Sequence, residues 1–320
     1  MKKTISVILV LATILTVCLG FASCSNNDSG KYVIGICQLT QHAALDAATQ
    51  GFIDAVKQEL GEDNVEFDMQ NAAGDTNVCS TIVTSFVNKK VDLILANATP
   101  ALQSAYGATQ TIPVLGTSIT EYSVALDIEN FNGTVGGNVS GTSDLAPLDQ
   151  QVDMIVEICP DVKTVGIIYC SAEANSKYQV EKVTEYLSKK NITAKSYPFS
   201  DSNDISAIVT AAASECDALY VPTDNTAASC AETIGNVVRE KKVPVFAGEE
   251  NTAKACGVAS LSISYYDLGV QTGKMAAKIL KGEANISEMP IEYAPATKKY
   301  NKDMAEALGI TIPEGYTEIE

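Results

Sequence analysis

The sequence predicts an α/β fold with two doubly wound, Rossmann-like parallel-sheet lobes joined by a multi-strand hinge. The main observation is an internal repeat, because three short apolar runs occur twice in the same order. The matched runs are residues 33–37 with 165–169, 92–95 with 217–220, and 112–116 with 243–247. Gly35 and Pro113 are 78 positions apart, and so are Gly166 and Pro244. A chain of 320 residues can also form two lobes, each with a full core.

Apolar runs rich in β-branched residues predict strands, and apolar periodicity near 3.6 residues predicts helices. In the first half, strands are expected at 32–39, 65–69, 92–96 and 112–115, with helices at 43–60, 77–88 and 101–107. In the second half, helices at 148–158, 176–189, 205–213 and 227–240 alternate with strands at 164–169, 193–197, 218–221 and 243–246. This alternation is typical of a parallel sheet with helices on both faces.

The connections between the lobes are expected where the alternation stops. The Gly-rich stretch 132–138 has no G-x-G-x-x-G fingerprint, so we interpret it as a passage between lobes. Residues 257–262 are expected to return the chain to the first lobe, which also receives a helix at 268–280. The C-terminal residues, with a helix at 303–308, are expected on the second lobe. Lobe 1 is therefore expected to comprise 31–142 plus 262–285, and lobe 2 143–261 plus 286–320.

The N-terminus has the pattern of a lipoprotein signal peptide. Lys2 and Lys3 precede an apolar run up to Phe21, and small residues stand directly before Cys24. This pattern predicts a signal peptide over 1–23, lipid on Cys24 and a polar tether over 24–30. An uncleaved anchor is the alternative, because the run is nearly long enough to span a membrane. In both cases the protein is expected on the extracytoplasmic face of the cell membrane.

Composition narrows the classes of partner. The formal net charge is −17, and removing Lys2 and Lys3 with the signal peptide makes it −19. Such a charge argues against nucleic acid and against anionic lipid headgroups as partners. Seven cysteines remain besides Cys18 and Cys24, without C-x-x-C or zinc-like spacing, so free thiols and disulfides both stay open. His42 is the single histidine, and neither a metal nor a cofactor is predicted.

Candidate binding residues follow the ends of the predicted strands, where doubly wound sheets bind ligands. They are Gln38, His42, Thr99, Thr117, Ser118, Glu173, Asn175, Ser176, Asp224, Asn225, Thr226 and Glu249. Helix capping is the alternative for the hydroxyl and amide side chains. Solvated loop acids are the alternative for the carboxylates, and a satisfied polar residue at a helix start is the alternative for His42. The acids lie in loops poor in Lys and Arg, so together they would suit a ligand ammonium group.

Taken together, these loops resemble the ABC-transporter substrate-binding lipoproteins of the type I periplasmic-binding-protein fold, in particular the tryptophan-binding, TrpX-like branch. The resemblance covers nearly all of the mature chain. Its motifs include Gln38-x-x-x-His42, Gly137-Asn138-Val139-Ser140-Gly141-x-Ser143-Asp144, Glu173-Ala174-Asn175-Ser176, Pro222-Thr223-Asp224-Asn225-Thr226 and Tyr265-Tyr266-x-Leu268-Gly269.

The resemblance implies a binding protein without catalytic activity that captures an amino acid, with an aromatic one favoured. It also implies delivery to an ABC permease and its ATPase. The carboxylate would be held by Thr99, Thr117 and Ser118, and the ammonium by Asp224 or Glu249. Glu173, Asn175, Ser176 and Asp144 would close over the ligand. Thr120-Glu121-Tyr122 replaces the family's usual Thr-Asp-Pro, which leaves the side-chain pocket open to variation.

Two other functions remain compatible with the sequence. The same fold serves receptors that sense a nucleoside or a sugar and are coupled to signalling. An extracytoplasmic hydrolase would need an activated nucleophile, yet His42 is the only ordinary base and no G-x-S-x-G motif occurs.

Overall fold

The computed structural model describes residues 30–320, and every structural statement below refers to them. The expected signal peptide, Cys24 and all of the expected tether except Gly30 lie outside the described residues. Among residues 30–320, no helix combines the length and the apolar character needed to cross a membrane.

The first lobe is built on a six-stranded sheet in the order β2-β1-β3-β4-β5-β11, with all strands parallel. Its strands are β1 (Tyr32–Gln38), β2 (Val65–Asn71), β3 (Leu93–Asn97), β4 (Val114–Ile119), β5 (Val139–Ser143) and β11 (Glu292–Tyr293).

The second lobe is built on a seven-stranded sheet in the order β7-β6-β8-β9-β10-β12-β13, in which β12 runs antiparallel to β10. Its strands are β6 (Thr164–Cys170), β7 (Thr193–Phe199), β8 (Ala218–Val221), β9 (Val245–Ala247), β10 (Ala259–Ser262), β12 (Thr297–Tyr300) and β13 (Thr317–Glu318). The first five strands of each lobe thus have the same spatial order. The repeated apolar runs fall on matching strands, so the predicted two-lobed α/β fold is confirmed.

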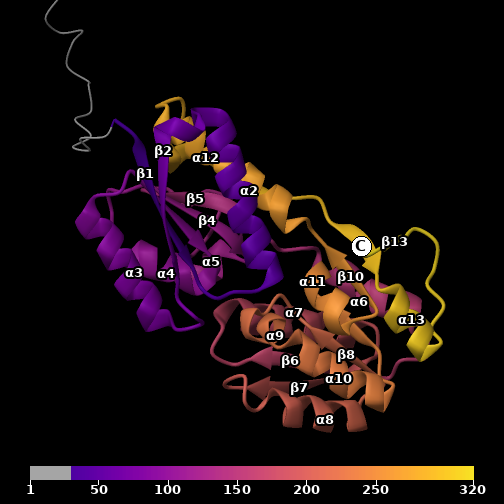
Figure 1. Cartoon of the computed structure of the whole chain (residues 1–320). Coiled ribbons are helices and arrows are strands. Elements are labelled where there is room, and N and C mark those ends of the chain that lie inside the picture. Colours follow the sequence, from indigo (N-terminus) through magenta and orange to yellow (C-terminus); the bar gives the residue numbers. More distant parts are fainter. Residues whose placement is uncertain (1–29) are drawn as a thin grey trace, which may run out of the picture. The chain divides into compact units, whose positions relative to one another are not determined.

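Helices cover both faces of each sheet (Figure 1). In the first lobe, one core contains side chains of α3 (Thr76–Lys89) and α4 (Thr99–Ala108), and the other contains side chains of α2 (Ala43–Leu60) and α12 (Tyr265–Leu280). In the second lobe, α6 (Leu148–Ile158) and α7 (Ala174–Lys189) cover one face, and α8 (Ile205–Glu215) and α10 (Ala231–Lys241) cover the other. The shorter helices are α5 (Tyr122–Ala125), α9 (Asn225–Ser229), α11 (Glu250–Cys256), α13 (Lys302–Leu308) and the 3₁₀ turns Glu62–Asn64 and Ile286–Glu288.

The chain crosses between the lobes three times, and two expectations about these crossings are wrong. The crossings follow β5, β10 and β11. Residues 286–293, expected in lobe 2, belong to lobe 1, because Ile286 and Ile291 are buried in its cores and β11 pairs with β5. Residues 257–262 are not a connection but include β10, a buried strand of the second sheet.

Two smaller differences concern elements that the apolar patterns of the sequence do not predict correctly. β5 was not expected as a strand, yet it lies in the sheet directly after the Gly-rich stretch. The single helix expected at 227–240 is two helices, α9 and α10, which are separated at Cys230.

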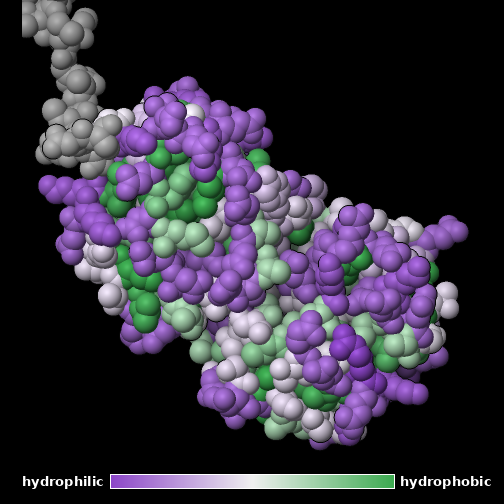
Figure 2. Space-filling view, viewed as in Figure 1, coloured by the Kyte–Doolittle hydropathy of each residue, from purple (hydrophilic) through white to green (hydrophobic). Residues whose placement is uncertain are grey.

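Glycines allow α2 and α12 to pack with their backbones in contact. An ideal Cβ on Gly269 would lie 2.0 Å from the Ala48 carbonyl oxygen, and one on Gly51 would lie 2.1 Å from that of Tyr266. These contacts are with backbone atoms, so no side-chain rotation can relieve them. Because Gly51 and Gly269 have no side chains, α12, which follows the crossing from the second lobe, packs directly on α2 of the first lobe. Over the visible face of both lobes, the surface is mostly hydrophilic (Figure 2).

We expect Gly269→Ala to lower the free energy of unfolding by about 1–3 kcal/mol, the usual cost of overpacking a close contact. Gly107→Ala is the matched control, because a Cβ at Gly107, also in a helix, meets no atom within 4 Å. That control is expected to be neutral or stabilising by about 0.5–1 kcal/mol, since alanine is the better helix former. Urea unfolding of both variants measures the difference, and equal stabilities would contradict the close-packing argument.

Candidate ligand-binding site

Loops at the carboxyl ends of the two sheets enclose a small cavity between the lobes, which we call the inner cavity. It has about 290 Å³ of space not filled by atoms. Its lining comes from both lobes and from two crossings: His42, Leu45, Ser118, Thr120, Asp144, Asn175, Thr223, Asp224, Asn225, Ala228, Glu249 and Tyr265. None of these twelve residues is a lysine or an arginine.

The thirteen expected site residues fall into three groups. Seven line the inner cavity: His42, Ser118, Asp144, Asn175, Asp224, Asn225 and Glu249. Glu173 and Thr226 line a neighbouring side recess between the lobes. Gln38, Thr99, Thr117 and Ser176 line neither space, although all four are buried.

Three of those four side chains serve the structure of their own lobe. Gln38 donates to Asp46 and accepts from Thr49. Thr117 belongs to a buried hydroxyl cluster that joins β4, β5 and α12. Ser176 donates a hydrogen bond to Asp224 over 2.7 Å. No hydrogen bond of the Thr99 side chain is recorded among the described residues.

Five lining residues were not among the expected ones: Leu45, Thr120, Thr223, Ala228 and Tyr265. Thr120 and Thr223 follow β4 and β8, so the strand-end rule could have selected them. Leu45, Ala228 and Tyr265 lie in the first turns of helices, where the strand-end rule does not look, although Tyr265 belongs to one of the motifs that carry the resemblance.

The carboxylate of Glu173 is fully used within the second lobe. Its Oε1 accepts hydrogen bonds from the amide and hydroxyl of Thr226, at 2.9 and 2.8 Å. Its Oε2 accepts from the amide and side chain of Asn225, at 3.0 and 2.6 Å, and from Asn175 at 3.2 Å. Glu173 therefore fixes the loop before α9 and does not present a free oxygen to the cleft.

Asp224 and Glu249 are likewise engaged. Asp224 accepts from the amide of Cys170 at 2.6 Å and from that of Ala227 at 2.8 Å, and it caps α9. Burial, followed by the nearby charge of Glu173, raises the pKa of Asp224 to about 7. Glu249 caps α11 by accepting from the amides of Asn251 and Thr252. Both acids keep their place in the cavity wall through helix N-termini.

Three buried oxygens in the cavity wall lack a hydrogen-bond partner: Asp144 Oδ1, Ser118 Oγ and Asn175 Oδ1. Their residues are 4%, 6% and 4% exposed. Buried polar atoms are nearly always hydrogen-bonded, so three unpartnered ones in one cavity indicate groups that await a ligand. Ser118 also has a left-handed backbone, with φ of 56°, at an irregularity of β4. Such strain is typical of functional positions.

Asp144 lies on the first crossing and contacts the second. Its Oδ2 accepts a hydrogen bond from the Tyr265 hydroxyl at 2.7 Å, and its amide donates to the Ile119 carbonyl. Burial raises the pKa of Asp144 to about 6 despite the Tyr265 hydrogen bond, which favours the ionised form. Glu249 contributes a smaller increase to this pKa through its negative charge. A cationic partner at Oδ1 would stabilise the carboxylate.

The two lobes touch each other across the cleft. His42 Nε2 lies 3.4 Å from Asn225 Oδ1, and the hydroxyls of Thr120 and Thr223 lie 3.3 Å apart. In each pair, one residue belongs to the first lobe and the other to the second. The described residues are therefore in a closed arrangement around the cavity.

Comparisons with known proteins identify the family of the chain. Residues 33–318 match the family model described as ABC transporter substrate binding protein. The chain is 33% identical to the tyrosine-binding protein of Clostridioides difficile strain R20291, over 96% of this chain and 92% of that protein.

Two solved structures are similar over the whole of their own chains. The ABC domain from Streptococcus pneumoniae in complex with L-Trp matches 91% of this chain at 35% identity, with a TM-score of 0.86. The ligand-free, open structure of CD0873 from Clostridium difficile matches 90% at 34% identity, with a TM-score of 0.69. The family model and these relatives establish that the chain belongs to the ABC transporter substrate-binding proteins, a family of binding proteins and not of enzymes.

Proposed function

We propose that this protein captures an aromatic L-amino acid in the inner cavity and delivers it to the permease of an ABC importer. The observation that carries the proposal is the set of three unpartnered buried oxygens in a cavity wall without Lys or Arg. Such a wall favours a ligand that brings its own positive charge, because an unpaired buried carboxylate is costly. The named ligands of the similar proteins, tyrosine and L-Trp, support the aromatic class.

In this proposal Asp144, and not Asp224 or Glu249, receives the ligand ammonium group. Asp224 and Glu249 already accept hydrogen bonds on both carboxylate oxygens, whereas Asp144 Oδ1 has none. Asn175 Oδ1 offers a second acceptor, and the Ser118 hydroxyl can donate to the ligand carboxylate. A zwitterion would thus satisfy all three groups at once.

We expect Asp144→Asn to weaken the binding of L-tyrosine and L-tryptophan by about 10- to 150-fold, the equivalent of one charge-assisted hydrogen bond of roughly 1.5–3 kcal/mol. Isothermal titration of the wild type and the variant measures the change. The protein contains no tryptophan, so the fluorescence of bound L-tryptophan gives an independent readout.

Asp161→Asn is the control for this substitution, because Asp161 is exposed and lines neither the cavity nor the recess. The wild type is also titrated with a nucleoside and a sugar. Binding of either of these in place of every aromatic amino acid would overturn the proposal. Unchanged affinity in Asp144→Asn would remove the assignment of the ammonium partner.

The affinity is expected to fall in acid, because the ligand ammonium requires ionised Asp144. With a pKa of about 6 in the empty protein, half of the Asp144 carboxyl is protonated at that pH, and affinity at pH 5 should be roughly tenfold lower than at pH 7. Titrations at both values measure this ratio. Because Asp224 titrates in the same range, the affinity ratio is also measured in Asp144→Asn. The part of the pH dependence that is due to Asp144 should disappear in this variant.

Acid weakens ligand binding, but through Asp144 it raises the free energy of unfolding of the empty protein. The pKa of Asp144 is raised from 3.8 on folding, so the folded state binds this proton more tightly than the unfolded state. Its contribution to the free energy of unfolding is therefore present below about pH 4 and is lost as the pH rises through 6. The increase in Tm caused by ligand should consequently be larger at pH 7 than at pH 5.

Delivery to a permease requires the protein to stay near the membrane, and we propose that lipid on Cys24 provides this. The support is the sequence pattern alone: a charged start, an apolar run and small residues before Cys24. Lipid attached there would hold the binding lobes at the extracytoplasmic face through the tether over 24–30.

We expect Cys24→Ala to move most of the protein from the membrane fraction to the soluble fraction when it is expressed from its full-length gene in a bacterial host. Cys18→Ala is the matched control, since it removes the other N-terminal cysteine and should leave the protein in the membrane fraction. Immunoblots of the separated fractions measure this distribution. Retention of the Cys24→Ala protein in the membrane would favour an uncleaved anchor.

A further inference from the structure

Three lining residues of the inner cavity carry its unpartnered oxygens: Asp144, Ser118 and Asn175. None of these three residues lines the side recess. If the proposed function holds, the charged head of the amino acid lies against these three residues. Its side chain must then extend along the rest of the cavity wall.

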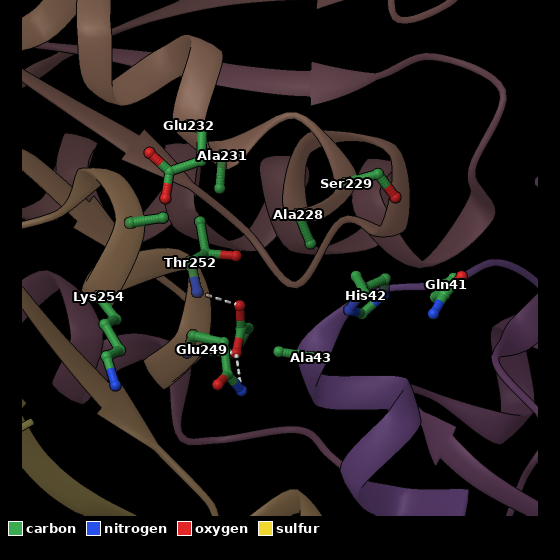
Figure 3. A pocket seen from close by; sticks show the side chains of 12 residues that line it. Gln41, His42, Ala43, Ala228, Ser229, Ala231, Glu232, Glu249, Thr252 and Lys254 are labelled. Carbon is green, nitrogen blue, oxygen red and sulfur yellow. Dashed lines mark hydrogen bonds between the residues drawn. The ribbon is translucent and has the colours of Figure 1, made fainter. Parts of the chain in front are cut away.

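Part of the remaining wall is shared with a second and larger space, which we call the outer chamber. It has about 1090 Å³ of space not filled by atoms. His42, Ala228 and Glu249 line both spaces, so these three residues form the mouth between them. Figure 3 shows Gln41, His42 and Ala43 at the start of α2 on one side of the chamber, facing residues of α9, α10 and α11 on the other.

The polar side chains at the mouth are already engaged with protein atoms. The Glu249 carboxylate accepts hydrogen bonds from the backbone amides of Asn251 and Thr252 and from the Asn251 side chain. A dashed line in Figure 3 marks the bond with Thr252. His42 lies against Asn225 across the cleft. Ala228 contributes only a methyl group, and it is half-buried in the short helix α9.

The volume of the inner cavity is a second reason to expect the ligand side chain to extend through the mouth. Sites for drug-sized ligands occupy roughly 300–1,000 Å³, whereas the volume of the inner cavity that a small molecule can occupy is only about 20 Å³. In this closed arrangement the inner cavity by itself does not hold both the head of an amino acid and a ring. A longer side chain needs the outer chamber, whose far wall carries Glu232 and Lys254.

We propose that the ligand side chain passes Ala228 toward the outer chamber, so that the site accepts aromatic amino acids extended at the far end of the ring. Ala228 is then the specificity-determining residue, because its small side chain keeps the mouth open. This inference rests on the proposed function, but it makes a separate claim about which side chains are bound.

The test compares L-tyrosine with O-benzyl-L-tyrosine, which keeps the same head group and extends the ring. The wild type is expected to bind both compounds, with affinities within tenfold of each other. Ala228→Leu should narrow the mouth and shift the affinity ratio against O-benzyl-L-tyrosine by at least tenfold. Leucine is a good helix former, so α9 should persist, and a thermal melt of the variant checks its fold.

Ala211→Leu is the matched control, since Ala211 is an exposed helical alanine of the same lobe and lines none of these spaces. It should leave the ratio as in the wild type. Rejection of O-benzyl-L-tyrosine by a wild type that binds L-tyrosine would overturn the inference while the proposed function stands. An unchanged ratio in folded Ala228→Leu would overturn the role of Ala228. Failure of every aromatic amino acid to bind would overturn the proposed function and this inference together.

Discussion

The burial of Asp144 where the chain crosses between the lobes is the constraint on which the site depends. Moving a carboxylate out of water costs several kcal/mol unless it finds partners, and the side-chain partners of Asp144 are the neutral hydroxyls of Tyr265 and Thr120, with Oδ1 left without a geometric hydrogen bond from a described residue. In the closed arrangement the protein therefore supplies no cation to offset the lost hydration of this carboxylate. A ligand cation at Oδ1 would stabilise the closed state more than an open, hydrated one, and this differential interaction would drive closure.

The other acids of the cleft have a different task. Glu173 accepts four hydrogen bonds from the first two residues of α9 and one from Asn175 of α7. Asp224 accepts three, from residues of β6, α7 and α9. They set the loop geometry before any ligand arrives, which reduces the ordering that binding must impose. Their charges also keep the cavity negative. Acids near a cleft can thus form the site without touching the ligand.

The sequence was sufficient for the lobes but not for every strand. The apolar runs around Gly35 and Gly166 predict their strands because buried parallel strands are continuously apolar. β5 contains serine, threonine and glycine, and β10 contains serine; both are strands because neighbouring strands bury them. The strand-end rule likewise found Ser118, Asn175 and Asp224. This rule does not distinguish an acid whose oxygens are all hydrogen-bonded from one with an unpartnered oxygen. Glu173 shows why, because its partners Asn225 and Thr226 are about fifty positions away in the sequence.

The two lobes share one strand order, yet they contribute different chemistry to the cavity. The first lobe offers hydroxyls, from Ser118 and Thr120, whereas the carboxylates come from the crossing and the second lobe. An amino acid zwitterion is itself asymmetric, with acceptors at one group and donors at the other. A symmetric pair of walls would bind it in two opposed orientations. Because the two lobes share the order of five strands but differ in their strand-end loops, the closed cleft can hold such a ligand in one orientation.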